Sequence, residues 1–255
     1  MRCDRLTTMW VAVFALAIAG CRTDPPGQAL EQTEGLSNDQ VLAALAERAN
    51  QVQRVMASGT IRLESDEDGS VLLDVALLAS GDDQLRLRAW KLGRPVFDLT
   101  RDGDALWLWI SERAEVDSTT TDGVPLAAIH IQTGWRMMAG RLFAQTPDRV
   151  ISEDPFIVEF DLASDQTGGA PARAQFAIDR ATQTHTRCTI IDSAGIERQT
   201  LQLGAYRLID GIPWATSIDS GTDDHRFQIT LESVELNGEL PPSSFTPPSN
   251  AQRQP

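Results

Sequence analysis

Five short extended runs follow one another between residues 60 and 110, and the connections between them are too short to hold a helix. These runs are Thr60–Ser65, Ser70–Ala79, Gln84–Trp90, Pro95–Thr100 and Ala105–Ile110. The connections are rich in Asp and Gly, which tolerate the left-handed backbone conformations of tight turns. Because a parallel pair of strands needs a connection of about a dozen residues or more, these strands must pair antiparallel. The sequence therefore predicts an antiparallel meander.

A second series of extended runs fills the later part of the chain. These are Phe156–Leu162, Ala172–Ile178, Arg187–Ile191, Gln199–Leu208, Trp214–Asp219 and Arg226–Leu236. In the first of them apolar residues alternate with Glu159 and Asp161, which is the pattern of a sheet with one wet face. In the last, the apolar alternation changes phase after Leu231, so we predict a β-bulge near Glu232–Ser233.

An amphipathic helix is expected ahead of the first strand. Apolar residues recur at helical spacing from Val41 to Met56. Ser37 and Gln40 form the Ser-x-x-Gln pattern of a capping box, and Gly59 lies just beyond the last turn. One face of this helix should cover the sheet.

Two further segments lack the strand pattern. Val124–Phe143 has apolar spacing compatible with one or two helices, broken near Gly134. Residues 246–255 are Pro-rich, and we expect them to be disordered. Residues 37–245 are long enough to bury one sizeable core, so we expect a single domain there.

The run Ala105–Ile110 (ALWLWI) is apolar on both faces. Because side chains alternate along a strand, Leu106 and Leu108 point to one side, and Trp107 and Trp109 point to the other. The amphipathic helix can cover one of these faces. The other face must meet more protein or line a cavity.

Residues 1–20 have the three-part pattern of an export signal. Arg2 and Arg5 precede the apolar run Met9–Ile18, which is too short to span a hydrocarbon core of about 30 Å. The run ends in the sequence IAGC, which resembles the bacterial lipobox. This resemblance implies that Cys21 is acylated and becomes the new N-terminus. An ordinary signal peptide with an incidental Cys is the alternative.

Residues 21–36 are then a lipidated Cys and a flexible tether, because the stretch after the Cys holds prolines and glycines and has no apolar periodicity. In lipoproteins of this kind, Asp directly after the Cys is associated with retention in the inner membrane. That position is Arg22 here. In a bacterium with two membranes, the resemblance therefore implies the outer membrane, with the protein facing the periplasm.

The charge balance excludes one class of partner. The full sequence has a net charge of −14, and loss of residues 1–20 removes two arginines and one aspartate, which makes the chain more negative by one. Nucleic-acid binding needs clustered basic residues, and Lys91 is the single lysine. We expect no nucleic-acid partner, and we expect membrane attachment to rest on acyl chains.

The helix, the meander and the closing strand together resemble the LolA/LolB-like superfamily of bacterial lipoprotein and lipid carriers. Three stretches carry the resemblance: Arg86–Ile110, Gly204–Asp219 and Ile229–Pro248. The last resembles the ending "strand, Asn, short turn, Phe-x-Pro" that is common among these proteins. The resemblance implies an α+β fold that is mainly β. Its strongly curved antiparallel sheet, an incomplete barrel, would be covered by the N-terminal helix and one or two further helices, with an apolar cavity between.

Carriers of this family line that cavity with aromatic and aliphatic side chains. The position-matched candidates for lipid binding are Trp90, Phe97, Trp107, Trp109, Trp135 and Met138. Aromatic residues on strands are also common core residues, so a filled core is the alternative for each. The anchored family member presents an exposed apolar residue on a protruding loop that inserts into membrane. The loop Glu115–Gly123 is polar, and the sequence shows no clear equivalent.

Catalytic and metal-binding motifs are absent from the sequence, including the nucleophile elbow, the zinc-protease helix, the Cys-x-x-Cys pair and the phosphate-binding loop. His130, His185 and His225 lie far apart, without the spacing of metal ligands. Cys188 stands in an apolar run, as a small buried residue would. We expect no cofactor, no metal and no enzymatic activity.

Two functions fit these observations. The first is an anchored lipoprotein that binds an acyl chain or lipoprotein lipid in an apolar half-barrel cavity. The alternative is a non-enzymatic envelope interaction or structural lipoprotein with a filled core. A carrier needs an open apolar cavity of a few hundred Å³, roughly, whereas the alternative does not. A catalytic pair converging in that cavity would instead indicate an enzyme, such as a hydrolase.

Overall fold

The computed structural model describes residues 30–65, 69–111, 136–162, 172–221 and 225–253. The described helices are the α-helix α1 (Asn38–Gln51), the 3-10 helix η1 (Arg141–Ala144) and a helical turn at residues 136–138. The strands are β1 (Arg54–Ser65), β2 (Gly69–Ser80), β3 (Gln84–Lys91), β4 (Arg94–Asp102), β5 (Ala105–Ile110), β6 (Arg149–Glu153), β7 (Phe156–Leu162), β8 (Ala172–Asp179), β9 (Thr184–Asp192), β10 (Glu197–Gly204), β11 (Arg207–Ile209), β12 (Ile212–Trp214), β13 (Ser217–Gly221), β14 (His225–Leu236) and β15 (Gln252–Arg253).

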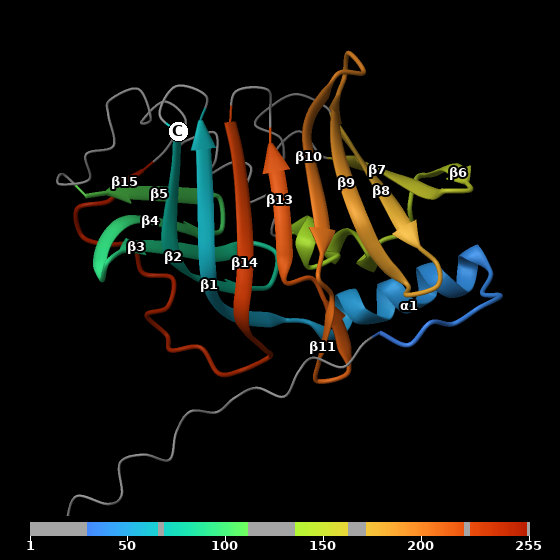
Figure 1. The fold of residues 1–255 in the computed structure, drawn as a ribbon, viewed down its shortest axis with the longest axis horizontal. Coiled ribbons are helices and arrows are strands. Elements are labelled where there is room, and N and C mark those ends of the chain that lie inside the picture. The colour runs from blue at the N-terminus through green and yellow to red at the C-terminus, as the bar shows by residue number, and fades with distance from the viewer. Residues whose placement is uncertain (1–29, 66–68, 112–135, 163–171, 222–224, 254–255) are drawn as a thin grey trace, which may run out of the picture.

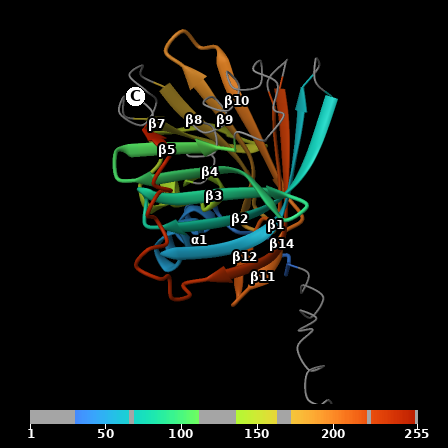
Figure 2. The same cartoon turned by 90° about the vertical axis from the view of Figure 1, so that its left-hand side faces the viewer.

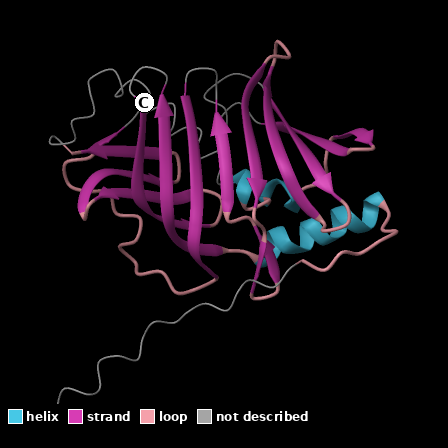
Figure 3. Ribbon diagram, viewed as in Figure 1, coloured by secondary structure: helices cyan, strands magenta, loops and turns pink. Residues whose placement is uncertain are grey.

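Thirteen of these strands form one antiparallel sheet in the order β15-β5-β4-β3-β2-β1-β14-β13-β10-β9-β8-β7-β6, and β11 and β12 form a separate hairpin. The sheet does not close into a barrel, because β15 and β6 stay at opposite ends of the order. It is strongly curved, so that β3–β5 run across the direction of β13 and β14 (Figure 1). Seen from the side, α1 lies behind β1–β3 (Figure 2), and strands make up most of the described chain (Figure 3). The predicted fold class is confirmed.

The predicted antiparallel pairing of the strands is confirmed, but Glu159 of β7, which was expected on a wet face, is fully buried beside Arg149 and Gln175. β5 and β7 have the predicted bounds, and the two meanders pair antiparallel throughout. The bulge in β14 is also present. Ser58 pairs with Ser233 and Gly59 with Leu231, which leaves Glu232 without a partner in the register. The change of phase in the apolar pattern of this strand is therefore the sequence signature of the bulge.

The N-terminal helix begins as predicted but ends earlier. Gln40 N donates to Ser37 Oγ over 3.3 Å, and Ser37 N donates to Gln40 Oε1 over 2.9 Å, which completes the capping box. However, α1 ends at Gln51 and β1 begins at Arg54. Gly59 does not terminate the helix. It lies inside β1, where a Cβ would stand 2.0 Å from the carbonyl oxygen of Thr230 in β14.

The C-terminal end is ordered over residues 246–253, so the prediction of a disordered tail is wrong for that part. After β14 the chain crosses the outer face of the sheet, where Arg86 Nη1 donates to the carbonyl oxygen of Ser244 over 3.0 Å. It then pairs as β15 with β5, with Gln252 opposite Leu108 (Figure 1). We call residues 238–253 the C-terminal strap. A Pro-rich segment can be ordered in this way because contacts with the sheet, rather than its own secondary structure, hold it.

Candidate functional site

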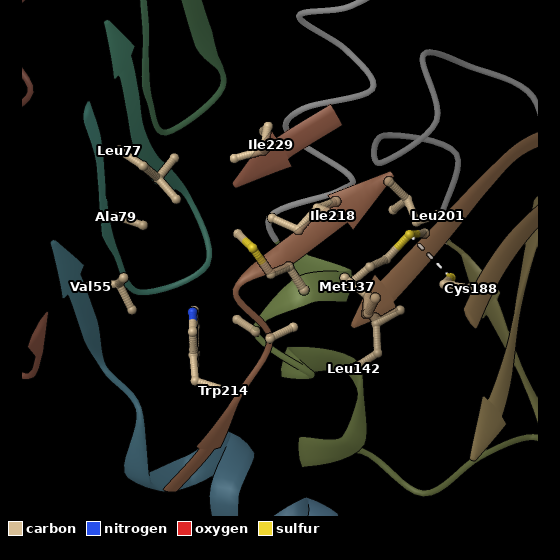
Figure 4. Close-up of a cluster of buried hydrophobic side chains, with 14 of the residues drawn as sticks. Val55, Leu77, Ala79, Met137, Leu142, Cys188, Leu201, Trp214, Ile218 and Ile229 are labelled. Atoms are coloured by element: carbon tan, nitrogen blue, oxygen red, sulfur yellow. Dashed lines mark hydrogen bonds between the residues drawn. The ribbon is translucent and has the colours of Figure 1, made fainter. Parts of the chain in front are cut away.

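The concave face of the sheet and residues 136–144, here called the interior segment, enclose an apolar interior. Figure 4 shows Met137 and Leu142 of this segment between side chains of both halves of the sheet. Val55 and Leu77 approach from one half, and Leu201 from the other. Met137 is fully buried, and its Sδ lies 3.2 Å from Sγ of buried Cys188 in β9. The interior segment therefore fills the space inside the curved sheet.

Aromatic rings pack around the C-terminal half of the interior segment. The Phe143 ring lies 5.4 Å from that of Phe160 and 5.0 Å from that of Phe176, both in edge-on geometry. Its centroid is also 5.6 Å from the ring of His185. Edge-to-face packing of this kind adds about 0.5–1.5 kcal/mol per pair beyond the burial of area. The cluster fixes Phe143 against β7–β9.

His185 and Arg141 hold the interior segment by hydrogen bonds. His185 Nε2 lies 2.6 Å from the carbonyl oxygen of Met137. Burial lowers the pKa of His185 to about 4, so its ring is neutral at neutral pH. Arg141 Nη1 donates to the carbonyl oxygens of Ala49 and Val52, over 2.8 and 2.7 Å, at the end of α1. The same guanidinium reaches Asp82 in the β2–β3 turn, with Nε 2.6 Å from Oδ1.

A small cavity of about 30 Å³ lies under α1. It is lined by Leu45, Arg48, Ala49, Val52, Met138, Ala139, Gly140, Phe143, Gln183, Thr184, His185, Tyr206, Ile212, Pro213 and Trp214. This volume holds one or two water molecules. Sites for drug-sized ligands enclose about 300–1,000 Å³. An acyl chain therefore fits this part of the described chain only if side chains of the interior segment move.

The structure divides the predicted lipid-binding residues between the two faces of the sheet. Phe97 packs against the core and Met138 is buried in it, so both belong to the interior. Trp107 and Trp109 lie on the outer face, because they pair with Thr100 and Asp98, whereas Leu108 pairs with buried Leu99 inside.

Trp90 also lies on the outer face, next along the strand to fully buried Ala89. The guanidinium of Arg88 stands over its ring at 5.1 Å. The three strand tryptophans therefore cannot share one interior cavity with Phe97 and Met138, and of the described candidates only Met138 lines the cavity. Trp135, and Cys21 as the predicted lipidation site, lie outside the described residues.

The outer face around the tryptophans has a structural role. Buried Asp98 accepts hydrogen bonds from Nε and Nη2 of Arg86, with Nη2 2.7 Å from Oδ2, and another from the Thr100 hydroxyl over 3.0 Å. Arg88 Nε lies 3.1 Å from the same carboxylate. Because Arg86 also donates to Ser244, this network ties the C-terminal strap to β3 and β4.

Leu92, in the turn between β3 and β4, is a candidate functional residue that sequence reasoning missed. Its side chain is 93 % exposed, and its backbone has a φ of +52°, followed by Gly93 at +75°. A left-handed conformation costs a residue other than glycine about 1–2 kcal/mol, and Asn or Asp normally takes this position. Exposed Lys91 and Arg94 flank the turn. The sequence could have indicated this turn, because it has Leu92-Gly93 where a two-residue hairpin turn usually has Asn-Gly or Asp-Gly.

Comparison with known proteins identifies the fold. No family model matches the chain, and no curated protein matches it. Among solved structures, a LolA superfamily protein from Nitrosomonas europaea has a TM-score of 0.55 and 11% identity, over 84% of this chain and 99% of that one. A DUF1329 family protein from Desulfovibrio piger has a TM-score of 0.55 and 10% identity, over 80% of this chain and 94% of that one.

A putative outer membrane lipoprotein-sorting protein domain from Vibrio parahaemolyticus has a TM-score of 0.46 and 10% identity, over 80% of this chain and 95% of that one. At these identities the similarity concerns the fold. The chain has the LolA-like fold that the sequence resemblance predicted. None of the described helices is long and apolar enough to cross a membrane. The described residues also contain no group of three or more His, Cys, Asp or Glu side chains placed to hold a metal ion.

Proposed function

We propose that this protein is an anchored envelope lipoprotein that shelters an acyl chain, or the lipid of another lipoprotein, inside its curved sheet. One observation carries the proposal: the apolar interior of an open sheet is filled by a short segment that polar contacts hold at Met137 and Arg141. His185 binds the segment at Met137, and Arg141 binds it to α1 and to Asp82. An entering ligand would have to displace side chains of this segment, which apolar packing of Phe143 also holds in place.

The ligand would take the place of side chains of the interior segment. Met137, Met138 and Leu142 are buried there, and methionine adapts readily to partners of irregular shape. Each methylene moved from water into this interior contributes about 0.8 kcal/mol. The function proposed is binding by burial, without catalysis.

Membrane contact would involve two features of the chain. Acylated Cys21 would anchor the protein, in the outer membrane facing the periplasm. The Leu92 turn would add a second, reversible contact, because its exposed leucine stands between two basic side chains. An apolar side chain flanked by Lys and Arg suits the boundary between headgroups and acyl chains.

A second function is also consistent with the structure, because the described cavity of about 30 Å³ is too small for an acyl chain as it stands. A filled interior fits an envelope interaction or structural lipoprotein on the same fold. In that case the interior segment is ordinary core, and no ligand replaces it.

Native mass spectrometry separates the two functions. The chain from Leu30 onwards, which holds every described element, is purified from a bacterial host and any bound molecule is extracted and identified. A carrier is expected to retain phospholipid or acyl chains, and replacing Trp109 on the outer face with Ala should leave them bound. A ligand-free mass that stays unchanged after incubation with lipid or acylated peptide would favour the structural lipoprotein.

A further inference from the structure

We propose that Arg48 forms an anion subsite at the mouth of the cavity, which binds the carboxylate or phosphate group of an acyl ligand. This inference rests on the proposed function and adds the chemical class of the ligand's head. The apolar chain would lie toward Met138 and Phe143, and the acidic head would lie against the guanidinium under α1.

Arg48 is the charged residue of this cavity. Among the lining residues it alone carries a formal charge at neutral pH. It projects from α1, three residues after Leu45 and seven after Val41, which are both buried in the core, and it is itself half-buried. Burial lowers the pKa of its guanidinium, which shows that the charged form is partly removed from water.

The hydrogen bonds of Arg48 leave its charge without a counter-ion in the described part of the chain. Nη1 donates to the carbonyl oxygen of Gln183, and Nη2 donates to Gln183 Oε1 over 3.1 Å. Both acceptors are neutral, and no ion pair of Arg48 with a carboxylate occurs among the described residues. Neighbouring Glu47 attracts Arg48 through space but forms no ion pair with it, because Glu47 is exposed, lies outside the cavity lining and accepts a hydrogen bond from Gln51.

The groups that line the cavity beside Arg48 supply no negative charge. His185 is neutral at neutral pH because its pKa lies at about 4. The Tyr206 hydroxyl donates to the carbonyl oxygen of His185 over 2.5 Å, and burial raises its pKa, so it stays protonated. A partly buried cation is costly without an anion, and a guanidinium has five donors, of which these contacts use two. A carboxylate or phosphate matches the remaining donors.

The test compares ligands of equal chain length that differ in their head. A fatty acid, its methyl ester, an alkyl phosphate and the corresponding alcohol are titrated against the chain from Leu30 onwards by native mass spectrometry. The acid or the phosphate should bind about tenfold more tightly than the ester and the alcohol, as a charge-assisted hydrogen-bond pair predicts. Whichever of the two binds better identifies the source of the anion.

Four variants test whether Arg48 causes the preference for an acidic head. Arg48→Gln should abolish the preference for an acidic head, whereas Arg48→Lys should keep part of it because the charge remains. Gln183→Ala removes the side-chain acceptor of Arg48 but leaves the backbone carbonyl contact and the charge of Arg48, so it should keep the preference. Arg62→Gln, which removes an exposed cation of β1, should change nothing.

The outcomes separate this inference from the proposed function. Equal binding of acid and ester by the unaltered protein would overturn the anion subsite and leave the carrier function standing. Equal loss of preference in Gln183→Ala and Arg48→Gln would show that Arg48 only braces α1, and would also overturn it. Failure of all four ligands to bind would overturn both proposals.

Discussion

The side-chain amide of Asn237 joins the end of β14 to the backbone of Gln53. Its Oδ1 accepts from Gln53 N over 2.8 Å, and its Nδ2 donates to the carbonyl oxygen of Gln51 over 2.9 Å. This one side chain therefore holds the junction between α1 and β1, and its backbone φ of +58° suits asparagine. These hydrogen bonds and the positive φ explain why asparagine occupies this position in the closing pattern of strand, Asn and short turn.

Asn237→Ala should lower the free energy of unfolding by about 1–2 kcal/mol, because three side-chain hydrogen bonds are lost and alanine tolerates a positive φ less well. Urea unfolding followed by circular dichroism measures the change. Asn50→Ala, which removes one exposed hydrogen bond within α1, is the control and should change stability far less. Equal effects of the two variants would contradict the role given to Asn237.

Asp98→Asn should lower the free energy of unfolding by about 3 kcal/mol, since it leaves buried Arg86 without its counter-ion. The same urea titration applies. The control is Asp219→Asn, whose pair with Arg226 is largely exposed and should contribute less than about 1 kcal/mol. A similar small loss at Asp98 would show that the outer-face network does not hold the strap.

His185 should make the fold less stable as the pH falls. Its pKa is about 4 in the folded protein, below its ordinary value of 6.5, so the unfolded chain binds the proton more readily. The contribution of neutral His185 to the free energy of unfolding is fully present above about pH 6.5 and is lost as the pH falls toward 4. The loss between pH 7 and pH 5 is about 2 kcal/mol. His185→Gln should remove this part of the pH dependence, as unfolding at the two pH values would show. If the free energy of unfolding of the variant changed with pH as much as that of the unaltered protein, His185 would not be the source of this pH dependence.

Leu92→Asn should stabilise the fold by about 1 kcal/mol, because asparagine adopts the left-handed conformation at lower cost. It should also weaken association of the unanchored chain with phospholipid vesicles by about tenfold, since an apolar side chain no longer enters the membrane. Thermal unfolding and vesicle co-sedimentation give the two readouts. Leu72→Asn, on the outer face of β2, is the control for vesicle binding, because its leucine is 54 % exposed but lies within a strand. If both variants bind vesicles equally well, the Leu92 turn is not a membrane contact.

The sequence predicted those elements whose periodicity leaves a single interpretation. β5 and β7 have their predicted bounds, and the bulge at Glu232 was predicted from a change of phase. The end of α1 could not be predicted in the same way. The apolar spacing of Val52 and Val55 fits both a helix and a strand, and pairing of Val55 with β2 and β14 decides between them.

The candidate site was harder to predict, because both faces of β5 are apolar. Alternation alone separates Trp107 from Leu108 but does not say which of them faces inward. The neighbouring strand decides this, since it places Thr100 opposite Trp107 and Leu99 opposite Leu108. The strap and the cavity depend on contacts between distant segments, such as Arg86 with Ser244 and Arg48 with Gln183, that no local pattern encodes.

Quenching of tryptophan fluorescence by a brominated acyl chain tests the central claim most directly. Trp214 is buried beside the cavity, whereas Trp90, Trp107 and Trp109 lie on the outer face. If an acyl chain binds inside the sheet, a brominated fatty acid should quench emission in a chain that carries Trp135→Phe, and much of that quenching should disappear when Trp214→Phe is added. Quenching that is absent, or that is the same after Trp214→Phe is added, would contradict binding in the interior.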